Sequence, residues 1–151
     1  GVSLGLCYRY FDSKQILFNT AIDLYIEECC NSYLAILHDS TITIKDKIDA
    51  LFTSIGDEHS NMQYYDFFHR VENEELHEQL SIKLCKYMYP HLLEAVKKAI
   101  AAKEIYIENP EALISFIIYG QVGLLSKSNI DHHEVAKLLN QYVNQLMKFN
   151  P

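Results

Sequence analysis

Apolar residues recur along this chain at intervals of three and four, the spacing that places side chains on one face of an α-helix. Only five glycines and three prolines interrupt the pattern, which favours long helices. We therefore predict an all-α protein. The expected helices cover residues 13–38, 44–59, 74–100, 110–126 and 131–147.

Three of these helices begin with residues that can satisfy the free backbone N–H groups of a first turn. Thr43 and Asp46, three positions apart, resemble a capping box, as do Asp131 and Glu134. Asn109 can cap the helix that follows it, whose first residue is a proline. These local patterns predict where the helices start.

The predicted 13–38 helix carries two apolar stripes that point in nearly opposite directions. Each residue turns the helix by about 100°, so the first and second halves present different faces. The first stripe comprises Leu17, Ala21 and Leu24, and the second comprises Ile26, Cys30, Tyr33 and Leu37. We interpret this helix as a link between two cores. The alternative is an ordinary buried helix with a wide apolar face.

The last two predicted helices carry more apolar surface than one chain can cover. The 110–126 helix is apolar on nearly all sides, and Gly120 and Gly123 allow another backbone to approach closely. The 131–147 helix is strongly amphipathic. We therefore expect a homodimer, the alternative being that both helices are core of one chain. The predicted interface residues are Ile118, Val122, Leu125, Val135, Leu139, Tyr142, Val143 and Leu146.

The net charge of the 151 residues is −7, which argues against nucleic-acid binding by the chain as a whole. The charge is unevenly distributed. Residues 1–18 contain Arg9 and Lys14 against Asp12, a balance of +1 that leaves −8 for the rest. An acidic body joined to a basic head has this distribution, and so does an ordinary acidic soluble protein.

The residue types that form disulfide, metal and catalytic sites do not occur in the required patterns. The cysteines Cys7, Cys29, Cys30 and Cys85 include one adjacent pair and no Cys-x-x-Cys spacing. The histidines lack the helical spacing of a metal pair, and no Ser/His/Asp order or phosphate-binding glycine loop is present. We predict no metal, no cofactor and no enzyme activity. Because no membrane span or signal peptide is evident, we expect a cytoplasmic protein.

The first eighteen residues have the pattern of the second half of a helix-turn-helix that continues into the 13–38 helix. Gly1 permits a tight turn, and Ser3 can cap a short helix that extends to Tyr10. Arg9 on this helix can reach phosphate oxygens or base edges. Lys14 lies in the first turn of the next helix, where the helix dipole disfavours a cation, so a DNA phosphate would be a suitable partner.

This segment resembles the TetR/AcrR family of transcriptional regulators. The family signature here is Gly-Val-Ser-x-Gly-x-x-Tyr-x-Tyr-Phe-x-Ser-Lys-x-x-Leu-Phe, and every fixed position is present. The resemblance implies that residues 1–18 belong to the DNA-binding domain and residues 19–151 to a ligand-binding and dimerisation domain. Family members have about two further helices before the position of Gly1. The 151 residues do not include them, so we expect weak operator binding without them. The alternative is a helical corner of another bundle.

The resemblance also implies which residues contact DNA and the effector. The predicted DNA-binding residues are Ser3, Leu4, Gly5, Leu6, Tyr8, Arg9 and Lys14. In the family, the later helices surround an effector pocket. The residues on those helices that we predict to line it are Phe52, Ile55, Tyr64, Tyr65, Phe68, Tyr87, Met88, Phe116 and Tyr119. Phenol hydroxyls within apolar walls suit an aromatic effector, although such residues also serve simply as core.

These observations predict a homodimeric transcription regulator, a repressor that leaves its operator DNA when a small-molecule effector binds. The alternative is a helical protein-interaction module with no DNA-binding role, in which the aromatic residues near position 65 dock a peptide. The sequence identifies neither the operator nor the effector.

Overall fold

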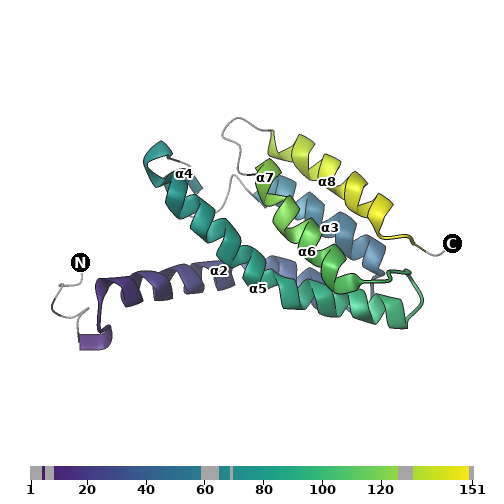
Figure 1. The fold of residues 1–151 in the computed structure, drawn as a ribbon, viewed down its shortest axis with the longest axis horizontal. Helices are drawn as coiled ribbons and strands as arrows, with labels where there is room; N and C mark the ends of the chain where they lie inside the picture. Colours follow the sequence, from purple (N-terminus) through teal and green to yellow (C-terminus); the bar gives the residue numbers. More distant parts are fainter. Residues whose placement is uncertain (1–4, 6–8, 59–64, 69, 126–130, 150–151) are drawn as a thin grey trace.

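The computed structural model describes residues 5, 9–58, 65–68, 70–125 and 131–149, and within these ranges the protein is helical apart from one isolated β-bridge between Ile105 and Phe149. The elements are α2 (Lys14–His38), α3 (Ile44–Glu58), α4 (Tyr65–Phe68), the 3-10 helix η1 (Val71–Asn73), α5 (Glu74–Ala101), α6 (Pro110–Gly120), α7 (Val122–Leu125) and α8 (His132–Leu146). Helix α8 lies along α3, α6 lies along α5, and α5 crosses α2 (Figure 1). The predicted all-α fold class is therefore confirmed.

Helix α2 begins and ends as predicted. The Ser13 hydroxyl accepts a hydrogen bond from the Ile16 N–H at 3.2 Å and caps the helix. The second predicted stripe is buried, together with one further residue that continues it towards the N-terminus. The buried residues are Ile22, Ile26, Cys30, Tyr33 and Leu37. The first predicted stripe is not buried in the described part of the chain, since Leu24 is 61% exposed. The start of α2 projects beyond the bundle (Figure 1).

The pairing of α3 with α8 depends on local caps and on one glycine. Thr43 and Asp46 form the predicted capping box, with each backbone N–H bonded to the other residue's side chain at 3.2–3.3 Å. The Asp131 carboxylate accepts hydrogen bonds from two N–H groups in the first turn of α8. A Cβ added at Gly56 would lie 3.0 Å from Nδ1 of His133. The absence of a side chain there lets the two helices approach closely.

A polar network also joins α3 to α8. The Asp49 carboxylate accepts hydrogen bonds from Asn140 at 3.0 Å and Asn144 at 3.2 Å, and Lys45 donates to it at 2.7 Å. Partial burial raises the pKa of Asp49, but these three hydrogen bonds outweigh that effect, so the pKa is lowered overall. The network fixes the register of the two helices.

Helix α5 runs without a break through Pro90 and packs against both α2 and α6. The Cys85 thiol of α5 donates a hydrogen bond to the backbone oxygen of Ile118 in α6, with a sulfur–oxygen distance of 3.3 Å. Asn109 caps α6 by accepting from the Ala112 N–H at 3.0 Å, as predicted. This side of the bundle is therefore fixed by apolar packing with one buried thiol contact.

The single helix predicted over residues 110–126 is wrong, because the chain is divided at Gln121 into α6 and the short α7. The N–H groups of Leu124 and Leu125 both bond to the Gln121 carbonyl, which starts a new turn. Gly120 and Gly123 flank the division. Glycine has a low helix propensity, so these residues weaken a continuous helix at this point.

The aromatic segment that follows α3 is described only from α4 onwards. Phe68 is buried and stacks on Tyr25 of α2, with ring centroids 5.2 Å apart, whereas Phe67 is exposed. Burial raises the pKa of the Tyr25 hydroxyl. In the described ranges no helix combines the length and the apolar character that crossing a membrane requires.

Candidate functional site

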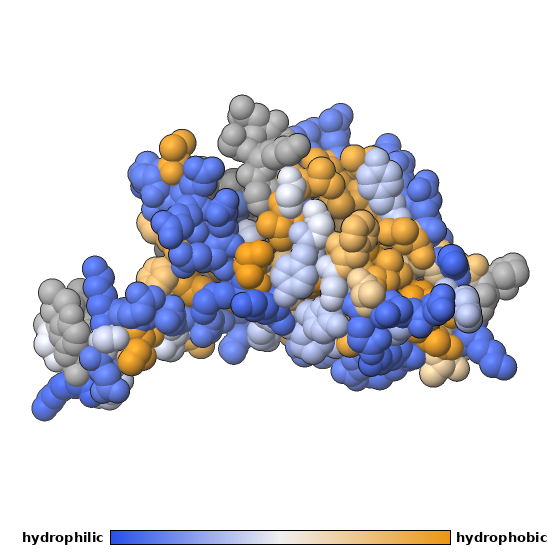
Figure 2. Space-filling view, viewed as in Figure 1, coloured by the Kyte–Doolittle hydropathy of each residue, from blue (hydrophilic) through white to orange (hydrophobic). Residues whose placement is uncertain are grey.

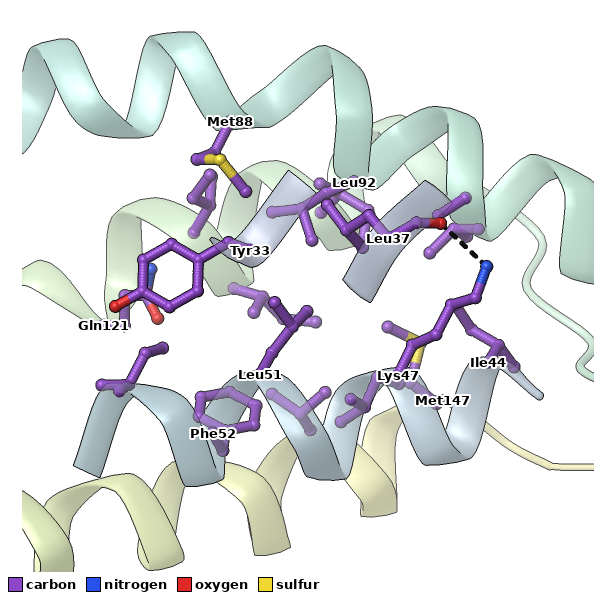
Figure 3. Close-up of a pocket in the computed structure, with 18 of the residues that line it drawn as sticks. Tyr33, Leu37, Ile44, Lys47, Leu51, Phe52, Met88, Leu92, Gln121 and Met147 are labelled. Atoms are coloured by element: carbon purple, nitrogen blue, oxygen red, sulfur yellow. Dashed lines mark hydrogen bonds between the residues drawn. The ribbon is translucent and has the colours of Figure 1, made fainter. Parts of the chain in front are cut away.

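A cavity of about 170 Å³ lies within the bundle, between α2, α3, α5, α6 and α8 (Figure 3). Apart from one tyrosine, one lysine and one glutamine, its lining side chains are apolar. They are Tyr33, Leu37, Ile44, Lys47, Ile48, Leu51, Phe52, Ile55, Leu84, Met88, Leu92, Ala95, Val96, Ile114, Ile117, Ile118, Gln121, Leu125, Val143 and Met147. Apolar cavities of about 150 Å³ hold a benzene ring. The cavity is therefore large enough for a small organic molecule.

The polar side chains of the cavity lie at its two ends. In Figure 3 the Tyr33 hydroxyl points towards Gln121, and Lys47 lies at the opposite end. Tyr33 is buried, whereas Gln121 and Lys47 are half-buried. Apolar side chains such as Leu51 separate the two ends. An occupant would therefore meet neutral hydrogen-bonding groups at one end and a cation at the other.

The position of Lys47 follows from the turn between α2 and α3. Its Nζ donates a hydrogen bond to the backbone oxygen of Leu37 at 2.8 Å. That oxygen lies in the last turn of α2, where carbonyls lack partners within the helix and where the helix dipole favours a cation. Lys47 makes no ion pair with any described residue.

The charge of Lys47 affects the pKa of one carboxylate, that of Asp39, although the two side chains form no ion pair. The Asp39 side chain accepts hydrogen bonds from the hydroxyl and the N–H of Thr41, at 2.6 and 2.8 Å. These bonds are the main reason why the pKa of Asp39 is lowered, and the positive charge of Lys47 adds a smaller effect. The Asp39 carboxylate is therefore bonded to Thr41 and is not in direct contact with the Lys47 ammonium.

Three of the nine residues predicted to line an effector pocket do line this cavity: Phe52, Ile55 and Met88. Phe52 and Ile55 lie on α3, and Met88 lies on α5. These three residues therefore lie where an effector pocket could form, and their role in binding an effector stays a prediction.

The other predicted pocket residues are not among those that line the cavity. Phe68 is buried against Tyr25, and Tyr87 lies beside His91 with ring centroids 5.7 Å apart. Phe116 and Tyr119 are exposed on the outer side of α6, because the inner side is occupied by Ile114 and Ile118. Tyr64 and the side chain of Tyr65 lie outside the described residues.

Sequence reasoning missed the polar residues of the cavity, although one of them left a signal. Lys47 lies three residues after Ile44 and four before Leu51, so it shares a helical face with apolar residues. A lysine in such a stripe places its ammonium next to a core. Tyr33 was assigned to a buried stripe, but nothing in its spacing distinguishes a cavity wall from a packed core.

Only part of the predicted DNA-binding set is described. Gly5 and Arg9 are helical and exposed, and Lys14 is exposed in the first turn of α2. Ser3, Leu4, Leu6 and Tyr8 lie outside the described residues. Arg9 and Lys14 form no ion pair with any described residue. Both cations are therefore available to an external anion.

The predicted dimer interface is divided between the inside and the outside of the bundle. Ile118, Leu139 and Val143 are buried within the chain itself, because these positions face α3 and α5. Val122, Leu125 and Val135 are half-buried, and Tyr142 and Leu146 are exposed. A second copy can thus reach only part of the predicted set.

Helices α6 and α8 each carry exposed apolar side chains. We call this surface the outer face; it comprises Phe116, Tyr119, Leu138, Tyr142 and Leu146. Phe116 is 70% exposed and Tyr142 is 50% exposed. A Cβ added at Gly120 or Gly123 would meet no atom within 4 Å. Figure 2 shows apolar side chains gathered on the side of the bundle that carries α6 and α8.

Two of the described cysteines, Cys30 and Cys85, are buried. Burial raises the pKa of Cys30 to about 12 and that of Cys85 to about 11, so both thiols stay protonated at neutral pH. In the part of the chain that the structure describes, no three His, Cys, Asp or Glu side chains gather in an arrangement that could hold a metal ion. The cavity is suited to binding an apolar molecule.

Comparison with known proteins adds no family assignment. The chain matches no family model, no curated protein and no solved structure. The cavity, the outer face and the N-terminal pattern are therefore the features from which a function can be inferred.

Proposed function

We propose that this protein is a DNA-binding transcription regulator of the TetR/AcrR type, a homodimeric repressor that a small molecule releases from its operator. One observation carries the proposal. Helix α2 lines the cavity through Tyr33 and Leu37, and its other end begins at Lys14, five residues after the exposed, helical Arg9. A single rigid element thus joins a ligand-sized cavity to the segment that has the helix-turn-helix pattern.

The geometry of α2 supports a mechanical link. Lys14 and Tyr33 are separated by about 28 Å along the helix axis at 1.5 Å per residue. An occupant that displaces Tyr33 or Leu37 would tilt α2, and the projecting end would move further than the end inside the bundle. In this mechanism the ligand favours one of two orientations that the protein already populates.

The outer face supports the homodimer. Its exposed aromatic residues, Phe116 and Tyr142, are of the type that anchors protein interfaces, and Gly120 and Gly123 permit a close approach of helices. A two-fold dimer suits operator recognition, because two reading helices must enter major grooves about 34 Å apart. Ligand-driven tilting of α2 would change that separation.

The test measures DNA binding by the full-length protein to a duplex from the region upstream of its own gene, using fluorescence anisotropy over a range of salt concentrations. We expect affinity to fall steeply with salt, and Lys14→Ala to reduce the salt slope by about 1 through loss of one phosphate contact. Lys86→Ala removes an exposed lysine from α5 and serves as the control.

Absence of DNA binding at low salt would contradict the proposal. So would equal effects of Lys14→Ala and Lys86→Ala, because the loss of affinity would then report only net charge. In either case the protein-interaction alternative, with the outer face or the aromatic segment as its docking surface, would become the better interpretation.

A further inference from the structure

The cavity wall selects for an occupant with an apolar body. Its central part is formed by aliphatic and aromatic side chains such as Leu51, Phe52 and Met88, which cannot hydrogen-bond to a polar molecule. The volume of about 170 Å³ limits that body to one ring or a short alkyl chain. Large or highly polar effectors are therefore disfavoured.

Lys47 is the one formally charged residue among those that line the cavity. An ammonium group has three donors, and a single hydrogen bond, to the Leu37 carbonyl, is made to described residues. An ammonium that is half-buried beside apolar side chains gains from a negatively charged partner. Since no described carboxylate pairs with Lys47, an anionic group on the occupant can take that place.

The opposite end of the cavity has different chemistry. Tyr33 and Gln121 offer a phenol and a carboxamide, which are neutral and attract an anion less than an ammonium does (Figure 3). The two ends therefore define an orientation. The charged end of an occupant should lie at Lys47 and its apolar body should extend between α3 and α5.

We infer that the cavity binds a small amphiphilic carboxylate, a monoanion with a single ring or a short alkyl chain whose carboxylate pairs with Lys47. This inference deepens the effector site and rests on the proposed function only for its regulatory meaning. The binding chemistry itself depends on the cavity alone.

The test compares pentanoate with pentanamide, two probes of the same length that differ in charge at one end. Dissociation constants are measured by calorimetry with the full protein near neutral pH. We expect pentanoate to bind about ten-fold more tightly than pentanamide, the gain typical of a charge-assisted hydrogen bond. Benzoate and benzamide test the same difference with a ring as the apolar body.

Three variants locate the preference. Lys47→Met should bind pentanoate and pentanamide equally, and Lys47→Arg should retain the preference for pentanoate. Lys45→Met, which removes an exposed lysine from the same helix, is the matched control and should behave like the wild type. Circular dichroism confirms that each variant is folded, and Lys47→Arg gives a readout even if Lys47→Met is unstable.

Equal binding of pentanoate and pentanamide by the wild type would overturn the inference. A preference that survives Lys47→Met, or failure of both probe pairs to bind, would overturn it as well. These results are independent of DNA. A regulator with another kind of effector would still show salt-dependent DNA binding, and a carboxylate-binding protein without DNA affinity would contradict only the proposed function.

Discussion

The two parts of helix α2 carry similar residues in different surroundings. Its trailing part, residues 22–38, contributes every buried side chain of the helix, whereas no side chain is buried in its leading part, residues 14–21. Two isoleucines make the comparison direct, since Ile16 is 45% exposed and Ile26 is 3% exposed. The difference shows that neighbouring helices, and not apolar character alone, decide burial along α2.

The surroundings of the two parts explain the contrast. The trailing part packs against α3 and α5, while the leading part projects beyond the bundle (Figure 1). Ile16 and Phe18 remain exposed there. In the proposed regulator, the DNA-reading head packs on this leading part.

The sharpest test of the comparison replaces the two isoleucines in turn. Ile26→Ala should lower the free energy of unfolding by about 2–5 kcal/mol, because it removes buried methyl groups and leaves a cavity. Ile16→Ala should lower it by less than about 1 kcal/mol, because much of that side chain is already in water. Urea unfolding followed by circular dichroism measures both changes.

Equal losses for the two variants would contradict the comparison, because Ile16 would then be covered in solution. Repeating the unfolding at several protein concentrations identifies the cover. A loss for Ile16→Ala that grows with concentration would indicate a second copy of the chain, and a constant loss would indicate contacts within one chain.

A second test concerns the α3–α8 pair, in which α3 packs against the trailing part of α2. Asp49→Ala should lower the free energy of unfolding by about 1 kcal/mol, since it leaves Asn140 and Asn144 without their shared acceptor in a partly exposed site. Lys45→Ala removes only the exposed ion pair to the same carboxylate and should cost less than Asp49→Ala.

The contribution of Asp49 should also depend on pH. Its pKa in the folded protein is lower than the ordinary value of 3.8, so its stabilising effect is fully present above that value. The effect is lost as the pH falls below 3.8 and through the lowered pKa. The difference in unfolding free energy between the wild type and Asp49→Ala should therefore shrink towards zero in acid. A difference that stays constant down to the lowest pH at which the protein folds would assign the effect to packing.

Helix starts could be predicted from the sequence because their determinants are local. Four helices that the sequence pattern predicts are capped by Ser13, Thr43, Asn109 and Asp131. Each cap needs only residues two or three positions away. The division at Gln121 was missed, since two glycines lower helix propensity without fixing where a helix stops.

Which side chains lie inside the bundle and which lie on its surface was harder to predict than the helix starts. Leu138 and Leu139 are adjacent leucines in α8, yet the second is buried and the first lies on the outer face. The sequence shows that both faces are apolar, but which face meets α3 depends on contacts distant in the chain. The same limit explains why Phe116 was expected in the pocket and lies on the surface.

The smallest expected effect concerns the one ion pair that joins α2 to α5 among the described residues. Lys83 Nζ lies 2.7 Å from the Asp23 carboxylate, just inside the trailing part, and both side chains are partly exposed. We expect Asp23→Asn to change the free energy of unfolding by no more than about 0.5 kcal/mol, and less in high salt, because water and ions screen such a pair. A double-mutant cycle with Lys83→Met isolates the interaction from other effects of each substitution. A coupling above about 1 kcal/mol would mean that α2 is firmly held to α5 at Asp23. The leading part would then have little freedom to tilt.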